Sequence, residues 1–238
     1  MSGALLPSDL GTVLGVWAHP DDEAYLMAGT ALLAASAGSA VACVTATAGE
    51  AGESADEERW PHQRLERIRR DELAASLAIL GITDHTWLDL PDGRLAKSDR
   101  SDGVCLLSEA IERVQPDTIL TFGPDGMTGH PDHVAVGDWA VEAAARVRGT
   151  ACRVLAATKT PAWLDKFSGV NDGILALDPP CTPPEELALH VSLDDEMLDR
   201  KLRALQAQAS QTSELIAALG DAMYRSWLSD EFWVICEH

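Results

Sequence analysis

The sequence has few basic residues and no long hydrophobic run. Its 238 residues include 18 Lys and Arg against 38 Asp and Glu, which gives a formal net charge of −20. A surface this acidic repels nucleic-acid phosphates and anionic lipids, so we expect a small-molecule partner, no nucleic acid and no membrane. The early apolar run from Val13 to Ala18 is far too short to span a bilayer. The start of the chain also lacks the basic residues of a signal peptide.

Cysteines are few and scattered. The sequence contains Cys43, Cys105, Cys152, Cys181 and Cys236, an odd number that includes no C-x-x-C pair. This spacing argues against a disulfide framework and against a zinc site built from cysteines. It predicts a protein of a reducing compartment, and we expect a cytoplasmic location.

Strand-like and helix-like segments alternate through most of the chain. The expected strands are residues 12–18, 41–45, 85–88 and 118–122, and the expected helices are residues 23–37, 61–80, 103–114, 132–147 and 194–219. Residues 161–184 look irregular, with a clear break from Asp178 to Pro184. The alternation predicts an α/β fold that is Rossmann-like, with a mostly parallel sheet and helices on both faces. The length fits one domain, which we expect to span residues 1–238.

The residues after the first and fourth expected strands are unusual. No G-x-G-x-x-G follows the first strand, which argues against a dinucleotide site. The segment His19-Pro-Asp-Asp-Glu23 stands there instead, and Gly129-His-Pro-Asp-His133 comes after the strand at 118–122. Ligands of such sheets bind beyond the carboxyl ends of the strands. Imidazole and carboxylate are zinc ligands, so the two segments together predict a catalytic metal site with an open position for water.

A structural reading of the same residues also exists. Acidic residues such as Asp21, Asp22 and Glu23 suit the start of a helix, where they offset the helix dipole. A single histidine at a helix start is usually a capping or surface residue. Capping does not require two His-Pro-Asp segments, however, and their pairing after two strands favours the metal site.

The two histidine segments resemble those of the PIG-L/LmbE-like family of zinc-dependent de-N-acetylases. Further similar segments are Thr47-Ala-Gly-Glu-Ala-Gly52, Arg69-x-x-Glu72, Leu80-Gly81, Pro91-Asp-Gly93, Ser210-Gln211 and Glu231-Phe232. The resemblance therefore covers nearly the whole chain. Two positions depart from it: Gln208 stands where many relatives have a histidine, and Thr128 where some have a tyrosine.

The resemblance implies a role for each residue of the two segments. It makes His19, Asp22 and His133 zinc ligands, Asp21 the general base, His130 the electrostatic stabiliser or general acid, and Asp132 the residue that orients His130. It also implies that Arg69 binds substrate. Elementary chemistry agrees, because amide hydrolysis needs an activated water, a polarised carbonyl and a proton for the leaving amine.

Two acidic loop residues complete the expected site. Glu50 and Asp92 lie in loops, where function concentrates, and we expect them to contact substrate. The loops at 47–60, 90–100 and 124–129 are polar and rich in glycine, which favours a small N-acetylated sugar over a lipid chain. The alternative is a pocket closed by residues 161–184.

The sequence thus predicts a zinc-dependent hydrolase that removes an acetyl or other acyl group from the amine of a small polar substrate, such as a derivative of N-acetylglucosamine. Two other functions stay open: a zinc hydrolase of a non-sugar amide or an ester, and a catalytically silent ligand-binding protein on the same scaffold. The sequence also leaves open whether the native metal is Zn²⁺ or Fe²⁺, and whether the chain forms a homo-oligomer.

Overall fold

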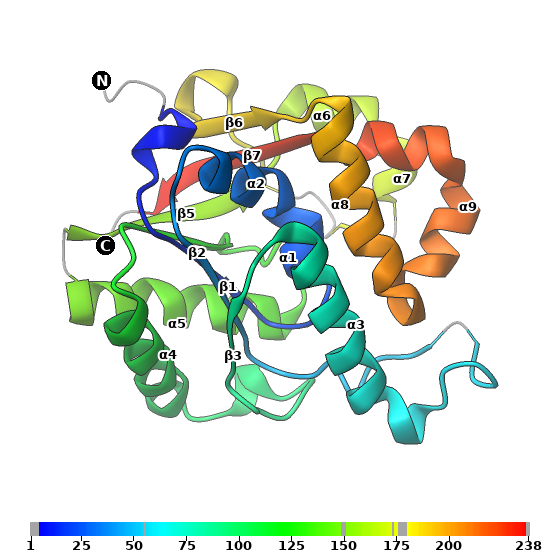
Figure 1. Ribbon diagram of the computed structural model, residues 1–238, viewed down its shortest axis with the longest axis horizontal. Coiled ribbons are helices and arrows are strands. Elements are labelled where there is room, and N and C mark those ends of the chain that lie inside the picture. Colours follow the sequence, from blue (N-terminus) through cyan, green and yellow to red (C-terminus); the bar gives the residue numbers. More distant parts are fainter. Residues whose placement is uncertain (1–4, 55, 149–150, 173, 176–179, 237–238) are drawn as a thin grey trace.

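The computed structural model describes residues 5–54, 56–148, 151–172, 174–175 and 180–236 (Figure 1). In chain order, its strands and α-helices are β1 Val13–Trp17, α1 Asp22–Leu26, α2 Ala28–Ser36, β2 Val41–Thr45, α3 Leu65–Leu80, β3 Asp84–Trp87, α4 Arg100–Val114, β4 Thr118–Phe122, α5 Pro131–Arg148, β5 Arg153–Thr158, α6 Pro161–Lys166, α7 Ser168–Asn171, β6 Leu189–Ser192, α8 Asp195–Ala207, α9 Ala209–Trp227 and β7 Asp230–Cys236.

The described strands form one sheet in the order β3-β2-β1-β4-β5-β7-β6. Strands β1 to β5 pair with one another in parallel, and β7 and β6 add an antiparallel edge next to β5. Every residue of β1 and β4 is buried, as expected for central parallel strands that helices cover on both faces. The fold class predicted from the sequence is confirmed.

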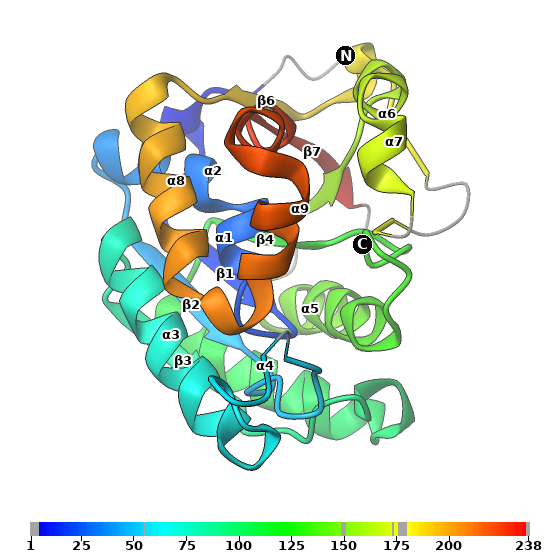
Figure 2. The same cartoon turned by 90° about the vertical axis from the view of Figure 1, so that its right-hand side faces the viewer.

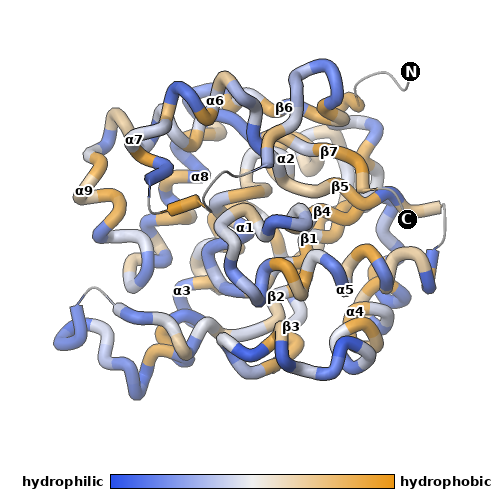
Figure 3. The backbone as a smooth tube through the Cα atoms, turned by 180° about the vertical axis from the view of Figure 1, so that it is seen from behind, coloured by the Kyte–Doolittle hydropathy of each residue, from blue (hydrophilic) through white to orange (hydrophobic). Residues whose placement is uncertain are grey.

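Helices cover both faces of this sheet (Figures 1 and 2). Helices α4 and α5 pack together on one face, and α5 contacts β1, β4 and β5. On the other face α8 contacts α1, α2 and α3. Hydrophobic segments gather along the strands between these layers, while the loop from β2 to α3 is mostly hydrophilic (Figure 3). No helix among the described residues is long and apolar enough to cross a bilayer.

The structure corrects the expected helices at three places. The helix expected at 23–37 divides at Met27 into α1 and α2, and the one expected at 194–219 divides at Gln208 into α8 and α9. The segment 161–184, expected to be irregular, contains the short helices α6 and α7. The expected break from 178 to 184 begins outside the described residues.

A buried carboxylate of the last strand binds both α2, through hydrogen bonds, and α8, through an ion pair. Glu231 is 3% exposed, and its carboxylate accepts hydrogen bonds from the backbone N–H groups of Gly29 and Thr30 and from the Thr30 hydroxyl. The ammonium of Lys201, on α8, lies 2.7 Å from the same carboxylate. Because α2, α8 and β7 meet at this one buried carboxylate, its contacts hold the three elements together.

Candidate metal centre and cavity

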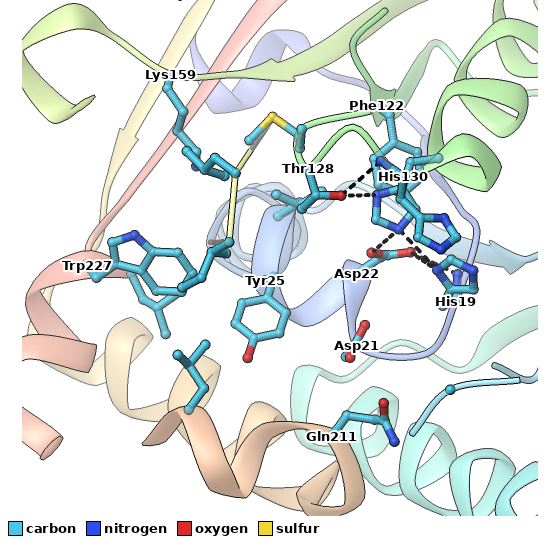
Figure 4. A pocket seen from close by; sticks show the side chains of 18 of the residues that line it. His19, Asp21, Asp22, Tyr25, Phe122, Thr128, His130, Lys159, Gln211 and Trp227 are labelled. Carbon is cyan, nitrogen blue, oxygen red and sulfur yellow. Dashed lines mark hydrogen bonds and ion pairs between the residues drawn. The ribbon is translucent and has the colours of Figure 1, made fainter. Parts of the chain in front are cut away.

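The two histidine segments meet because their strands are neighbours. Strand β1 pairs directly with β4 in parallel, so the carboxyl ends of both strands lie at the same edge of the sheet. His19 follows β1, and His130 and His133 stand at the start of α5 after β4. Figure 4 shows His19, Asp22 and His130 gathered on one side of a cavity at this edge.

Three side chains present ligand atoms to one point. Nδ1 of His19 lies 3.1 Å from Nε2 of His133. Oxygens of Asp22 lie 3.8 Å from the first nitrogen and 3.5 Å from the second. Tetrahedral zinc, with bonds of about 2.0–2.1 Å to nitrogen or oxygen, separates its ligand atoms by roughly 3.3 Å. The spacing of these atoms therefore fits a tetrahedral metal ion.

Hydrogen bonds fix the orientation of His133. Its Nδ1 donates to the carbonyl of Gly126 over 2.9 Å, which leaves the lone pair of Nε2 facing His19 and Asp22. The ring also stacks on Phe122 at 4.2 Å. Gly126 has φ of +63°, and a Cβ there would come within 2.8 Å of His133, so a glycine allows this close approach. Burial lowers the pKa of His133 to about 4, which keeps the imidazole neutral, as a metal ligand must be.

Two carboxylates face the other nitrogen of His19. Its Nε2 lies 3.0 Å from Asp92 and 3.7 Å from Asp132, although no well-directed hydrogen bond forms there. Metal-binding histidines commonly present their second nitrogen to a carboxylate, which orients the ring and raises its basicity. Burial lowers the pKa of His19, but Asp132, Asp92 and Asp22 outweigh it and raise that pKa to about 10. The carboxylates around His19 thus favour a positive charge at this position, either on the protonated ring or on a bound metal ion.

Other groupings of possible ligands overlap with this set. The described residues also bring together His19, His130 and His133, and separately His19, Asp92 and Asp132. The second grouping is the weaker candidate, because its carboxylates already accept N–H bonds from Ala51, Gly93 and Leu95. His130 lies 4.9 Å from His19 and from His133 between ring centroids, at the edge of the centre.

Asp21 stands beside this centre in a strained conformation. Its φ is +95°, a region that non-glycine residues rarely adopt, and such strain persists where the surrounding structure imposes it. The carboxylate lines the cavity and lies 3.6 Å from the guanidinium of Arg69. Burial raises the pKa of Asp21 to about 6, with Arg69 opposing the shift. Glu23 supports the turn by accepting the backbone N–H of Asp21 over 3.0 Å.

The position of Asp132 corrects one expectation. We expected its carboxylate to orient His130, but the carboxylate accepts the N–H groups of Gly93 and Leu95 and faces His19. The contact with His130 is made by the backbone N–H of Asp132, which donates to Nδ1 over 3.2 Å. The reason is local: the carboxylate and the backbone N–H of this first-turn residue point in different directions.

The expected substrate contacts also take different positions. Asp92 lines the cavity, but its carboxylate is occupied by His19 and by the N–H of Ala51. Glu50 is not among the cavity-lining residues, and it accepts the N–H of Asp92 over 2.9 Å. Glu50 and Asp92 therefore join two loops at the metal centre, since each carboxylate accepts an N–H from the other loop.

Arg69 lines the cavity, yet its guanidinium holds the backbone around it. It donates to the carbonyls of Gly49 over 2.9 Å and Pro20 over 2.6 Å, and it is only 5% exposed. A Cβ on Gly49 would come within 2.1 Å of the guanidinium, which explains the glycine there. The geometry thus favours Arg69 as a residue that positions the turn of Asp21, while its contact with substrate stays a prediction.

Replacing Arg69 tests this positioning role. Arg69→Met removes two charge-assisted hydrogen bonds and leaves Asp21 without its buried partner, so we expect unfolding to become easier by about 3 kcal/mol. Arg67→Met is the matched control, because Arg67 pairs with Asp71 at the surface and should change stability by less than about 0.5 kcal/mol. Urea denaturation of the metal-free proteins measures both. Equal urea midpoints of unfolding for Arg69→Met and Arg67→Met would contradict the positioning role of Arg69.

The cavity extends well beyond the metal centre. It has a volume of about 440 Å³, and its far wall includes Tyr25, Lys159, Trp163 and Trp227. Residues of the 161–184 segment do contribute to the wall, as the alternative held, together with the polar loops around Gly52, Gly93 and Thr128. The wall therefore combines these polar loops with apolar side chains, among them Ile174, Leu175 and Leu215.

Comparison with known proteins identifies the family. The model of the GlcNAc-PI de-N-acetylase family, PIG-L, matches residues 14–144, more than half of the chain. The chain belongs to this family. By family it is a hydrolase of the deacetylase type, and the matched residues contain both histidine segments of the candidate metal centre.

Individual relatives agree with this assignment. A 1D-myo-inositol 2-acetamido-2-deoxy-alpha-D-glucopyranoside deacetylase of Corynebacterium efficiens is 32% identical over 236 residues, covering 87% of this chain and 75% of the relative. The enzyme of the same name from Kineococcus radiotolerans is also 32% identical, but the alignment covers 59% of this chain and only 46% of that protein. In structure, the chain resembles the N,N'-diacetylchitobiose deacetylase of Pyrococcus horikoshii with a TM-score of 0.64, at 24% identity over 96% of this chain and 84% of the other.

Proposed function

We propose that the chain is a metal-dependent N-deacetylase that releases acetate from an N-acetylated amino sugar, with His19, Asp22 and His133 as the metal ligands. The observation that carries this proposal is the convergence of the three side chains: the two ring nitrogens lie 3.1 Å apart, and each lies within 3.5–3.8 Å of one oxygen of the Asp22 carboxylate. The sugar-type substrate is supported by the names of the PIG-L relatives, both of which are deacetylases of a 2-acetamido sugar.

The bound metal would polarise the acetamide carbonyl and lower the pKa of the attacking water. Asp21 then accepts the proton of this water. Its carboxylate lines the cavity and is not needed as a ligand, and a pKa of about 6 keeps it ionised at neutral pH while leaving it basic enough to accept a proton. Arg69 holds that carboxylate in place from 3.6 Å.

His130 supplies a hydrogen-bond donor to the developing oxyanion. Because Nδ1 accepts the backbone N–H of Asp132, the proton of the neutral ring lies on Nε2. Burial and the neighbouring histidines lower the pKa of His130, which favours a neutral Nε2–H donor over an imidazolium. His130 lines the cavity next to His19 and His133, so its Nε2–H would be available to a carbonyl oxygen bound there.

An acetate-release assay tests the proposal. The protein, loaded separately with Zn²⁺ and Fe²⁺, is incubated with methyl N-acetylglucosaminide, and acetate and free amine are both quantified. We expect equal amounts of the two products, and loss of both after chelation. Hydrolysis of O-acetyl esters alone would favour the hypothesis that the chain is an esterase. Metal binding without any hydrolysis would favour a silent binding protein, and either result would overturn the proposal.

A further inference from the structure

The cavity has a second end, beyond the carboxyl end of β5. Lys159 directly follows β5, as His19 follows β1 and the histidines of α5 follow β4. Since β1, β4 and β5 are consecutive parallel neighbours, their carboxyl ends lie at one edge of the sheet. Two strand spacings separate β1 from β5 by about 10 Å. Figure 4 shows Lys159 and Trp227 on one side of the cavity and His19 on the other, with Tyr25 between them.

The wall between these two ends is apolar and aromatic. It includes Tyr25, Trp163, Ile174, Leu175, Leu215 and Trp227. The aromatic rings support one another: the ring of Trp227 lies 6.1 Å from Tyr25 and 6.1 Å from Trp163. The indole N–H of Trp227 is occupied by the side-chain oxygen of Asn171, which fixes the ring. A rigid aromatic wall of this kind suits a planar or apolar group better than a solvated polar one.

Lys159 differs from the other cations of the cavity. Arg69 is occupied by two carbonyls, and Lys201 by Glu231. Among the described residues, the ammonium of Lys159 forms no hydrogen bond or ion pair, and it lies 4.5 Å from the centre of the Trp163 ring. Burial and the nearby Lys201 lower the pKa of Lys159 to about 8. A half-buried ammonium that lines a cavity and forms no ion pair of its own can take an anionic group as its partner.

We propose that this end of the cavity binds the part of the substrate that remains on the amine, and that this part is an apolar, preferably aromatic, group bearing an anion such as a carboxylate, which pairs with Lys159. The inference rests on the proposed deacetylase function, because an acetyl group is too small to fill a cavity of about 440 Å³. The group attached to the leaving amine, and not the acyl group, then packs against the aromatic wall. Of the three cations that line the cavity among the described residues, Lys159 is the one whose side chain is not occupied by a carboxylate or by backbone carbonyls, so an anion of the substrate would pair with it.

Binding to the metal-free protein tests the inference without turnover. Calorimetry compares three β-glycosides of N-acetylglucosamine: methyl, 4-carbamoylphenyl and 4-carboxyphenyl. We expect the carbamoylphenyl glycoside to bind at least about fivefold more tightly than the methyl glycoside, because of the aromatic wall. The carboxyphenyl glycoside should bind about tenfold more tightly again, because of its ion pair with Lys159.

Lysine variants separate the ion pair from the rest of the site. Lys159→Met should abolish the preference for the carboxyphenyl over the carbamoylphenyl glycoside. It should keep the preference for both aryl glycosides over the methyl glycoside. Lys159→Arg, which keeps the positive charge, should retain most of the preference for the carboxylate. Lys166→Met is the matched control, since Lys166 is an exposed lysine that lies over an aromatic ring, Phe167, outside the cavity. Retention of the aryl preference also shows that the methionine variant is folded.

The carboxylate preference should depend on pH. Lys159 is charged below a pKa of about 8, so the preference should be full at pH 7 and fall as the pH rises through 8 to 9. Asp125, Lys201, Asp230 and Glu231 also face Lys159. Any pH dependence that survives in Lys159→Met belongs to those groups.

Three outcomes would overturn the inference. The first is equal binding of the carboxyphenyl and carbamoylphenyl glycosides to the native protein, and the second is a carboxylate preference that Lys159→Met leaves intact. The third is that methyl N-hexanoylglucosaminide binds at least about fivefold more tightly than methyl N-acetylglucosaminide, the factor expected for the aryl group. The last result would assign the aromatic wall to the acyl chain. The deacetylase proposal fails separately, through lack of acetate release from methyl N-acetylglucosaminide by the metal-loaded protein.

Discussion

His133→Ala should reduce bound zinc from about one ion per chain to a small fraction of that, and should lower kcat/KM at least about a thousandfold. The nitrogen of His133 supplies one corner of the triangle formed with His19 and Asp22. Without it, two protein ligands remain, fewer than the three that catalytic zinc sites have. Metal analysis after dialysis and the acetate-release assay measure the two effects.

The matched control is His62→Ala. His62 is exposed and does not line the cavity, so zinc content and rate should both stay at the native level. Full zinc occupancy in His133→Ala would remove His133 from the ligand set and favour the grouping of His19, Asp92 and Asp132, which does not contain it. The ring of His133 also stacks on Phe122, so a denaturation curve of the metal-free variant separates loss of a ligand from loss of fold.

The parts of this protein that the sequence predicts well are those with local causes. Strands β1, β2 and β4 are short apolar runs, and helix α3 has clear periodicity and ends at Gly81 in a left-handed conformation. The two histidine segments were found because each follows such a strand. The neighbouring positions of β1 and β4 in the sheet then bring the segments together.

The features that the sequence does not predict have distant causes. Strand β7 pairs with β5 in antiparallel fashion, and its Glu231 is stabilised by Lys201 and by the start of α2, far away in the sequence. The break between α8 and α9 falls at Gln208, whose side-chain amide donates to the buried Glu23 over 2.7 Å. Neither contact leaves a mark on the local pattern of apolar and polar residues.

The far end of the cavity escaped prediction for the same reason. Lys159, Trp163 and Trp227 come from three elements that meet only when β5 and α9 are in place. A lone lysine after an unrecognised strand, and a tryptophan near the end of a helix, look like ordinary surface and core residues. Once β5 is recognised as the parallel neighbour of β4, the rule that ligands bind at the carboxyl ends of strands directs attention to Lys159.

Asp21→Asn should keep the metal and lose turnover, with kcat lower by roughly a hundred- to ten-thousandfold and KM little changed. Asparagine has almost the size of aspartate and tolerates positive φ better than most residues, so the strained turn at φ +95° should survive. The amide cannot accept the proton of the attacking water at neutral pH, which is why the effect should fall on kcat.

Asp71→Asn serves as the control for Asp21→Asn, because Asp71 pairs with Arg67 on the exposed side of the same helix that carries Arg69. Its zinc content, kcat and melting temperature should match the native protein. Zinc analysis and steady-state kinetics on methyl N-acetylglucosaminide then decide between two roles for Asp21. Zinc lost together with activity would make Asp21 a ligand, and a nearly native kcat would assign the proton transfer to another group. If Asp21, held 3.6 Å from Arg69, is the general base, Asp21→Asn must keep full zinc occupancy while its kcat falls at least about a hundredfold.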